Sequence, residues 1–129
     1  MIKVYVNKES YYPVKAPKIK KVVRDFLKAK RITSDAEISI ALVGNTKMLE
    51  LCKKYLKENE LHNVLSFTES EVGQKFIYPP ESSIRLGEVV VCYPKAVEEA
   101  KKEQKLIDQK VIELILHGTE HLLGHHHED

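Results

Sequence analysis

Histidines dominate the end of the 129-residue sequence, whose last thirteen residues contain five of its six histidines. His117 and His121 stand four residues apart, so on a helix they project from one face, one turn apart. Two imidazoles in this relation can reach one metal ion at the usual Zn–N distance of ~2.0–2.1 Å. Gly124 predicts a helix end, after which the chain turns back and presents His127 as a third ligand. Three nitrogen ligands leave one coordination position open to water, as in catalytic zinc sites.

The remaining histidines have simpler interpretations. His125 and His126 are predicted to face solvent, with His126 the alternative third ligand if the turn is one residue tighter. The run of three could also be the remnant of a purification tag, against which the following Glu128 and Asp129 argue. His62 stands alone and is predicted to be a polar loop residue. Three imidazoles suit zinc, and they also suit nickel, copper or iron.

The segment from His117 to His121 also spells H-x-x-E-H, the pattern of the inverzincin peptidases. The three-histidine spacing equals that of the metzincins, but their catalytic glutamate follows the first histidine, where this sequence has Gly118. Glu120 points roughly 100° away from its neighbour His121 around a helix. It is predicted to be a solvated helix residue and is a weak candidate for a general base. A small metallopeptidase is therefore a less favoured function.

Hydrophobic periodicity predicts the elements that must position these histidines. Alternating or continuous apolar residues predict strands at 2–6, 36–43, 64–67 and 86–91, the last with the continuous run typical of burial on both faces. Helical spacing predicts helices beginning near Pro17, Asn45 or Thr46, Pro94 and Leu106. Residues 69–83 are predicted to form a long loop. The order β-α-β-α-β-β-α-α predicts an α/β or α+β fold, with helices against one small sheet, in a single domain over residues 1–129.

Charge is distributed unevenly along the sequence. Residues 1–31 hold ten basic and two acidic side chains, whereas residues 32–129 hold eleven basic and seventeen acidic ones, which together give the net charge of +2. The apolar spacing places most of the N-terminal basic residues on one helix surface. Such a surface can attract a polyanion such as RNA. A solvated helix face with many lysines explains the same charge distribution equally well.

The apolar content predicts neither a membrane span nor an export signal. The longest apolar run is five residues, Val89 to Tyr93, and the N-terminus lacks the apolar core of a secretion signal. A cytoplasmic protein is therefore expected. Cys52 and Cys92 lie far apart and are predicted to be packed free thiols.

Three segments together resemble the YbeY family of bacterial endoribonucleases, also called rRNA maturation factors. The segment His117-Gly-Thr-Glu-His121-Leu-Leu-Gly-His-His-His127 is similar to the family signature H-G-x-L-H-L-x-G-Y-D-H. The stretch from Tyr55 to Phe67 is similar to Y-R-x-K-D-x-P-T-D-V-L-S-F, and residues 86–91 are similar to L-G-D-I-x-I. These segments occur in the family's order and spacing, and the likeness covers nearly the whole chain.

The resemblance implies a mixed four-stranded sheet flanked by helices, with one zinc-like metal ion held by His117, His121 and His127. It implies a hydrolase, a metal-dependent endoribonuclease specific for single-stranded RNA, with His117 and His121 holding the metal that activates water. The expected roles are maturation of the 3′ end of small-subunit rRNA and ribosome quality control. The expected partners are small-subunit ribosomal proteins and a ribosome-assembly GTPase.

Candidate RNA contacts come from charge and position. The family's arginine after the tyrosine falls at Leu56, and Lys53, Lys54 or Lys57 is expected to supply charge nearby, without the bidentate contact of a guanidinium. The other candidates are Ser66, by its position on the third strand, and the basic helix residues Lys20, Lys21 and Arg24. Leu56 also favours the alternative that the protein is a non-catalytic ribosome biogenesis factor whose metal clamps the last helix.

Overall fold

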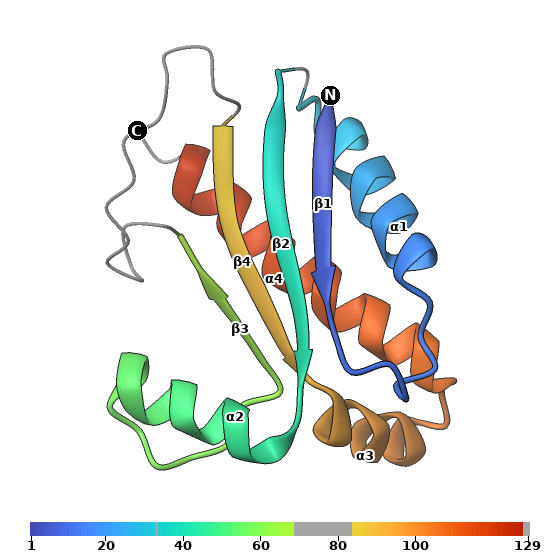
Figure 1. The fold of residues 1–129 in the computed structure, drawn as a ribbon, viewed down its shortest axis with the longest axis vertical. Helices are drawn as coiled ribbons and strands as arrows, with labels where there is room; N and C mark the ends of the chain where they lie inside the picture. Colours follow the sequence, from blue (N-terminus) through green and yellow to red (C-terminus); the bar gives the residue numbers. More distant parts are fainter. Residues whose placement is uncertain (33, 69–83, 128–129) are drawn as a thin grey trace.

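A computed structural model describes residues 1–32, 34–68 and 84–127 (Figure 1). The predicted loop at 69–83 lies outside the described residues. The elements are β1 (Ile2–Asn7), α1 (Ala16–Ala29), β2 (Ala36–Val43), α2 (Asn45–Leu51), the π-helical turn η1 (Cys52–Leu56), β3 (Val64–Phe67), β4 (Ile84–Cys92), α3 (Tyr93–Glu103) and α4 (Ile107–His127). This order confirms the predicted α/β fold class.

The four strands form one mixed sheet in the order β1-β2-β4-β3. β1, β2 and β4 are parallel, and β3 pairs antiparallel with β4 at one edge. Gly87 has a positive φ of 134°, and a Cβ at this position would lie 2.1 Å from the backbone oxygen of Phe67. Because both the conformation and the close approach exclude a side chain, β4 needs glycine where it passes the end of β3.

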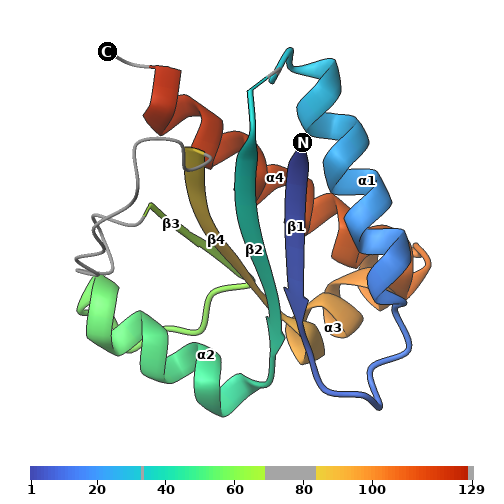
Figure 2. The same ribbon diagram turned by 45° about the horizontal axis from the view of Figure 1, so that its top comes forward.

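The sheet separates two hydrophobic cores. Val89 and Val91 face the larger core, which α1 and α4 complete, whereas Val90 faces a smaller core under α2 and η1. This alternation explains the continuous apolar run of β4 and confirms its predicted burial on both faces. Figures 1 and 2 show α4 running diagonally across one face of the sheet, with α1 beside it.

Two ion pairs join α1 to α4 near their two ends. Lys18 pairs with Asp108 near the start of both helices, and Lys30 pairs with Glu120 near the end of α1, each at 3.4 Å. All four side chains keep substantial solvent contact, so each pair contributes little stability by itself. Together they restrict how α1 can slide along α4.

α2 begins at Asn45, as predicted. Gly44 is the N-cap residue, and no side chain caps the helix. The Asn45 side chain instead accepts a hydrogen bond from the Cys92 thiol, with 3.1 Å between Sγ and Oδ1. Both cysteines are buried free thiols, as predicted. Among the helices described, none combines the length and apolarity that crossing a membrane requires.

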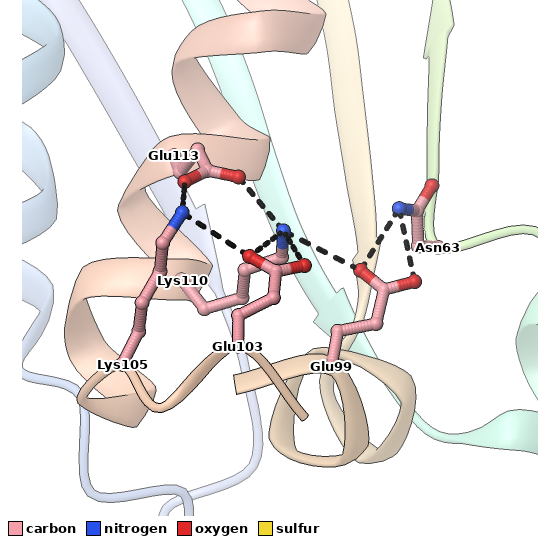
Figure 3. A network of polar contacts seen from close by, with 6 residues as sticks. All are labelled: Asn63, Glu99, Glu103, Lys105, Lys110 and Glu113. Carbon is pink, nitrogen blue, oxygen red and sulfur yellow. Dashed lines mark hydrogen bonds and ion pairs between the residues drawn. The ribbon is translucent and has the colours of Figure 1, made fainter. Parts of the chain in front are cut away.

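Lys110 is a buried lysine at the junction of α3 and α4 (Figure 3). Its Nζ donates to Glu113 at 2.7 Å and to Glu103 at 2.9 Å, and Lys105 bridges the same two carboxylates. The hydrogen bond to Glu113, with help from Glu103, raises the pKa of Lys110 above its ordinary value in spite of burial.

The polar cluster extends from the helices to the start of β3. Glu99 lies 3.7 Å from Lys110 and accepts a hydrogen bond of 3.1 Å from the Asn63 side chain. The Asn63 carbonyl also accepts the backbone N–H of Cys92 at 2.9 Å. The network therefore ties α3, α4 and the entry to the edge strand together.

Replacing Lys110 by methionine removes the buried cation and leaves only the more exposed Lys105 between Glu103 and Glu113. We therefore expect Lys110→Met to lower the free energy of unfolding by about 2 kcal/mol. The exposed Lys102 of α3 is the matched control, and Lys102→Met should change stability by less than about 0.5 kcal/mol. Urea denaturation measures both. Equal stability of the two variants would contradict a structural role for the network.

The Glu88 carboxyl is half-buried on β4, and burial raises its pKa, which the nearby Lys47 only partly offsets. The folded state therefore binds this proton more tightly than the unfolded state, and stability falls as pH rises through the unfolded and then the folded pKa. We expect Glu88→Gln to have a higher urea midpoint than the wild type at pH 7. In acid, where Glu88 is protonated, the two midpoints should become equal. The exposed Glu50→Gln is the control and should show no such crossover.

Candidate metal centre on the last helix

His117 and His121 lie on one exposed face of α4. Their ring centroids are 4.8 Å apart, with the ring planes at 69° to each other. This confirms that the two residues stand one turn apart on a helix, as their spacing predicts. Two neighbouring imidazoles open to solvent offer nitrogen donors to a single ion.

Gly118 brings this face of α4 close to the sheet. It is buried, and a Cβ here would lie 2.6 Å from Cγ1 of Val89 and 3.3 Å from Cγ2 of Val64. Any larger residue would push α4 away from β4 and β3. The neighbouring Thr119 is also buried, and its hydroxyl donates to the carbonyl of Ile115 at 2.8 Å. The helix therefore carries its histidines outward from a tightly packed inner surface.

Ser66 lies on the side of β3 that α4 covers. It pairs in register with Val89 and, two residues beyond Val64, shares the face of β3 that packs against Gly118. One turn after Gly118, the Leu122 side chain packs against Gly87 of β4. A Cβ added at Gly87 would lie 3.1 Å from Leu122 Cδ2. Ser66 is thus placed beneath the same turns of α4 that carry the two histidines.

The end of α4 differs from the prediction. The helix continues through Gly124 to His127, and Gly124 has no positive φ, so the predicted helix end at Gly124 is wrong. His127 is the sixth residue after His121, about 9 Å further along the helix axis. The His127 and His126 side chains lie outside the described part of the chain. Along this helical course, a third ligand at His127 requires the last turn to unwind.

Glu120 faces α1 rather than the histidines. Its Oε1 pairs with Lys30 at 3.4 Å, and the side chain is largely exposed. The helix rotation predicted from sequence therefore directs this carboxylate into a contact between helices. In this position it does not serve a metal held by His117 and His121.

The candidate RNA-binding lysines lie on the other side of the edge strand. Lys53 and Lys54 belong to η1 and Lys57 follows it, and all three are exposed. η1 is anchored by Tyr55, whose ring packs against Phe67 of β3 with centroids 4.9 Å apart. Lys54 Nζ lies over the Tyr55 ring at 5.2 Å from its centroid. β3 thus has the lysines of η1 on one face and α4 on the other.

The basic candidates of α1 form a second group. Lys21 is exposed and pairs with Asp25 at 2.9 Å, whereas Lys20 and Arg24 are half-buried and form no ion pair with a described residue. These residues lie on α1 and the others beside β3, so the structure does not bring the two groups together.

A cluster missed by the sequence analysis follows η1. Ligand atoms of Glu58, Glu60 and His62 lie within 4.8 Å of one another. In the sequence, these three residues occupy every second position, a spacing that could have indicated the cluster. His62 Nε2 pairs with Glu58 Oε2 at 2.6 Å. This pairing satisfies the imidazole without an ion, so the α4 pair remains the better metal candidate.

Comparison with known proteins identifies relatives along almost the whole chain. The family model described as Endoribonuclease YbeY matches residues 4–129. Proteins named Endoribonuclease YbeY from Dehalococcoides mccartyi (strain 195) and Acinetobacter baumannii (strain ACICU) are 32% and 31% identical over 123 and 115 residues. These matches cover 90% and 89% of this chain and 72% of each relative.

A solved structure shares the fold. The solution structure of TM1509 from Thermotoga maritima superposes with a TM-score of 0.56 at 20% sequence identity. The match covers 95% of this chain and 71% of that one.

The two glycines of α4 allow a direct test of the helix geometry. We expect Gly118→Ala to lower the free energy of unfolding by about 1–3 kcal/mol because the added methyl meets Val89. Gly124 has no atom within 4 Å of an added Cβ, so Gly124→Ala should stabilise the helix by up to about 1 kcal/mol. Urea denaturation measures both variants. If the chain instead left the helix at a left-handed Gly124, Gly124→Ala would destabilise the protein.

Proposed function

The chain belongs to the YbeY family of endoribonucleases, and from this premise we propose that it is a metal-dependent enzyme that cleaves single-stranded RNA. Its proposed substrate is the 3′ end of small-subunit rRNA, in ribosome maturation and quality control. The observation that carries the proposal is the His117–His121 pair, which is solvent-exposed on one face of α4.

His117 and His121 are proposed to hold one zinc ion, with His127 as the third ligand. The exposed imidazole nitrogens fit a divalent transition metal of this kind, and nickel, copper or iron would accept the same donors. When bound, zinc supplies a Lewis acid that lowers the pKa of its water to about 7. Recruitment of His127 would unwind the last turn of α4, a change that circular dichroism can follow.

The residues around β3 are proposed to hold the RNA backbone. Lys53 and Lys57 extend from one side of the edge strand, and Ser66 lies on the side of α4. Lys20, Lys21 and Arg24 of α1 provide a further basic surface. Lysine contacts to phosphate are point-like, and binding that depends on them should weaken with salt.

The proposed setting is the cytoplasm, where rRNA is matured. Small-subunit ribosomal proteins and a ribosome-assembly GTPase are the proposed partners, in keeping with the family. They would bring the enzyme to its rRNA substrate, so the isolated protein should cleave model RNAs with little sequence preference.

A second candidate function is a non-catalytic ribosome biogenesis factor. Leu56, which is 37% exposed, stands where the family has an arginine, so no guanidinium is available there for a bidentate phosphate contact. In this alternative the metal stabilises the end of α4 without turnover. A metallopeptidase is disfavoured because Glu120 of the H-x-x-E-H string pairs with Lys30.

His121→Ala should remove both the bound metal and RNA cleavage, since it deletes one of two adjacent ligands. Elemental analysis of the purified protein and a cleavage assay on fluorescent single-stranded RNA measure the two effects. His62→Ala is the matched control, because His62 pairs with Glu58 away from α4, and it should keep both properties. Unchanged zinc content in His121→Ala would refute the metal assignment.

Parallel incubations separate the three functions. The protein is mixed with single-stranded RNA or with an unfolded protein, each with and without a chelator. Chelator-sensitive cleavage of RNA alone supports the endoribonuclease. Loss of α4 helicity in chelator without any prior RNA cleavage supports the biogenesis factor, and cleavage of the unfolded protein supports the peptidase.

A further inference from the structure

Tyr11 is an exposed aromatic residue that packs against a pair of buried tyrosines. It is 74% exposed in the connection between β1 and α1. Its ring meets the ring of Tyr12 edge-on, with centroids 4.9 Å apart, and Tyr12 stacks on Tyr93 at 4.2 Å. Tyr12 and Tyr93 are buried, so they form a rigid base in the core beneath the exposed ring.

The backbone around Tyr11 is also held in place. Lys8 Nζ donates to the carbonyls of Tyr12 and Glu9 at 3.0 and 3.3 Å, and the Tyr12 N–H donates to the Glu9 carbonyl at 3.1 Å. These bonds close a turn around the exposed ring. A ring fixed in this way loses little conformational freedom when it binds a flat partner.

Tyr11 lies in the connection that leads into α1, whose exposed side carries several basic residues. Figures 1 and 2 show the β1–α1 connection at the end of the sheet where α3 starts. Lys20, Arg24 and Lys28 form no ion pair with a described residue, whereas Lys18, Lys21 and Lys30 are paired. Their spacing of four residues places Lys20, Arg24 and Lys28 on one face of α1. These three cations form a row along α1, a helix of 14 residues and about 20 Å that begins five residues after Tyr11 and ends beside Lys30, the partner of Glu120.

We propose that Tyr11 is a stacking platform for one base of a single-stranded RNA whose phosphate backbone follows the basic surface of α1. An aromatic face beside a row of cations is the arrangement by which proteins bind single-stranded nucleic acid without reading its sequence. An acidic protein would use the same cations, but a nucleic acid matches both features at once, with a base for the flat exposed ring and phosphates for the cations. This inference rests on the proposed function for its ligand, and it adds an anchoring site separate from the histidines.

The test measures RNA binding without cleavage. Affinity for a labelled 12-nucleotide oligouridylate is measured by fluorescence anisotropy, with the full-length protein in excess chelator. We expect Tyr11→Ala to raise Kd about tenfold, whereas Tyr11→Trp should keep the wild-type Kd, since the loss of one stacked base is of this order. Tyr5→Ala is the matched control, because Tyr5 is 51% exposed on β1 and contacts Glu37 instead of a basic helix.

Salt dependence separates stacking from charge. Tyr11→Ala should leave the slope of log K against log salt unchanged, whereas Arg24→Ala should reduce it by roughly 0.7, the value for one phosphate contact to a single strand. Lys102→Ala, an exposed lysine on α3, is the control for charge and should change neither Kd nor slope.

The outcomes distinguish this inference from the proposed function. An unchanged Kd in Tyr11→Ala, or an equal loss in Tyr5→Ala, overturns the stacking platform even if the wild-type protein cleaves RNA. An equal loss of affinity for a polyglutamate peptide also overturns it, in favour of an acidic protein partner. A Tyr11-dependent Kd in a protein that never cleaves RNA upholds the platform and overturns only the enzyme.

Discussion

The close contact between α4 and the sheet at Gly118 determines where the two histidines lie. The helix rests against Val89 and Val64 at Gly118, and one turn later Leu122 packs on Gly87. Both contacts need a glycine, one on the helix and one on the strand. Since the inner face of α4 is fixed at these two points, the positions of His117 and His121 on its outer face relative to β3 are fixed as well. A displacement of the helix would move both imidazoles together, because they belong to one rigid element.

The edge strand β3 lies between the two surfaces that the proposed enzyme must use. One face packs against α4, and the other packs against η1 through Tyr55 and Phe67. A phosphate held by Lys53 or Lys57 is therefore on the opposite side of a four-residue strand from the histidines. A flexible single strand can bend around such an edge, whereas a stiff duplex cannot. This geometry is compatible with the single-stranded substrate that we propose.

The sequence predicted the features that depend on local periodicity and missed those that depend on tertiary contacts. Alternation in β2 and the run in β4 identified their strands, and helical spacing placed His117 beside His121. Gly124 was misread because the left-handed preference of glycine is a small propensity, which a continuing helix can override. Lys110 could not be predicted as buried, since its burial depends on Glu103 and Glu113 meeting it across a helix junction. The ligand role of His127 stays a prediction.

The net charge of +2 is unevenly divided between the two helices that cover one face of the sheet, since α1 is basic and α4 supplies carboxylates that pair with it. α4 contributes Asp108 and Glu120, which neutralise lysines at both ends of α1. On α1 itself, Asp25 pairs with Lys21 and also attracts Lys28 and Arg24, which lowers the pKa of its carboxyl. Neither Leu56 nor the lysines of η1 can bind a phosphate bidentately as an arginine does. The RNA contacts that we propose for α1 and η1 are therefore separate single contacts, and binding that depends on several such contacts weakens with salt.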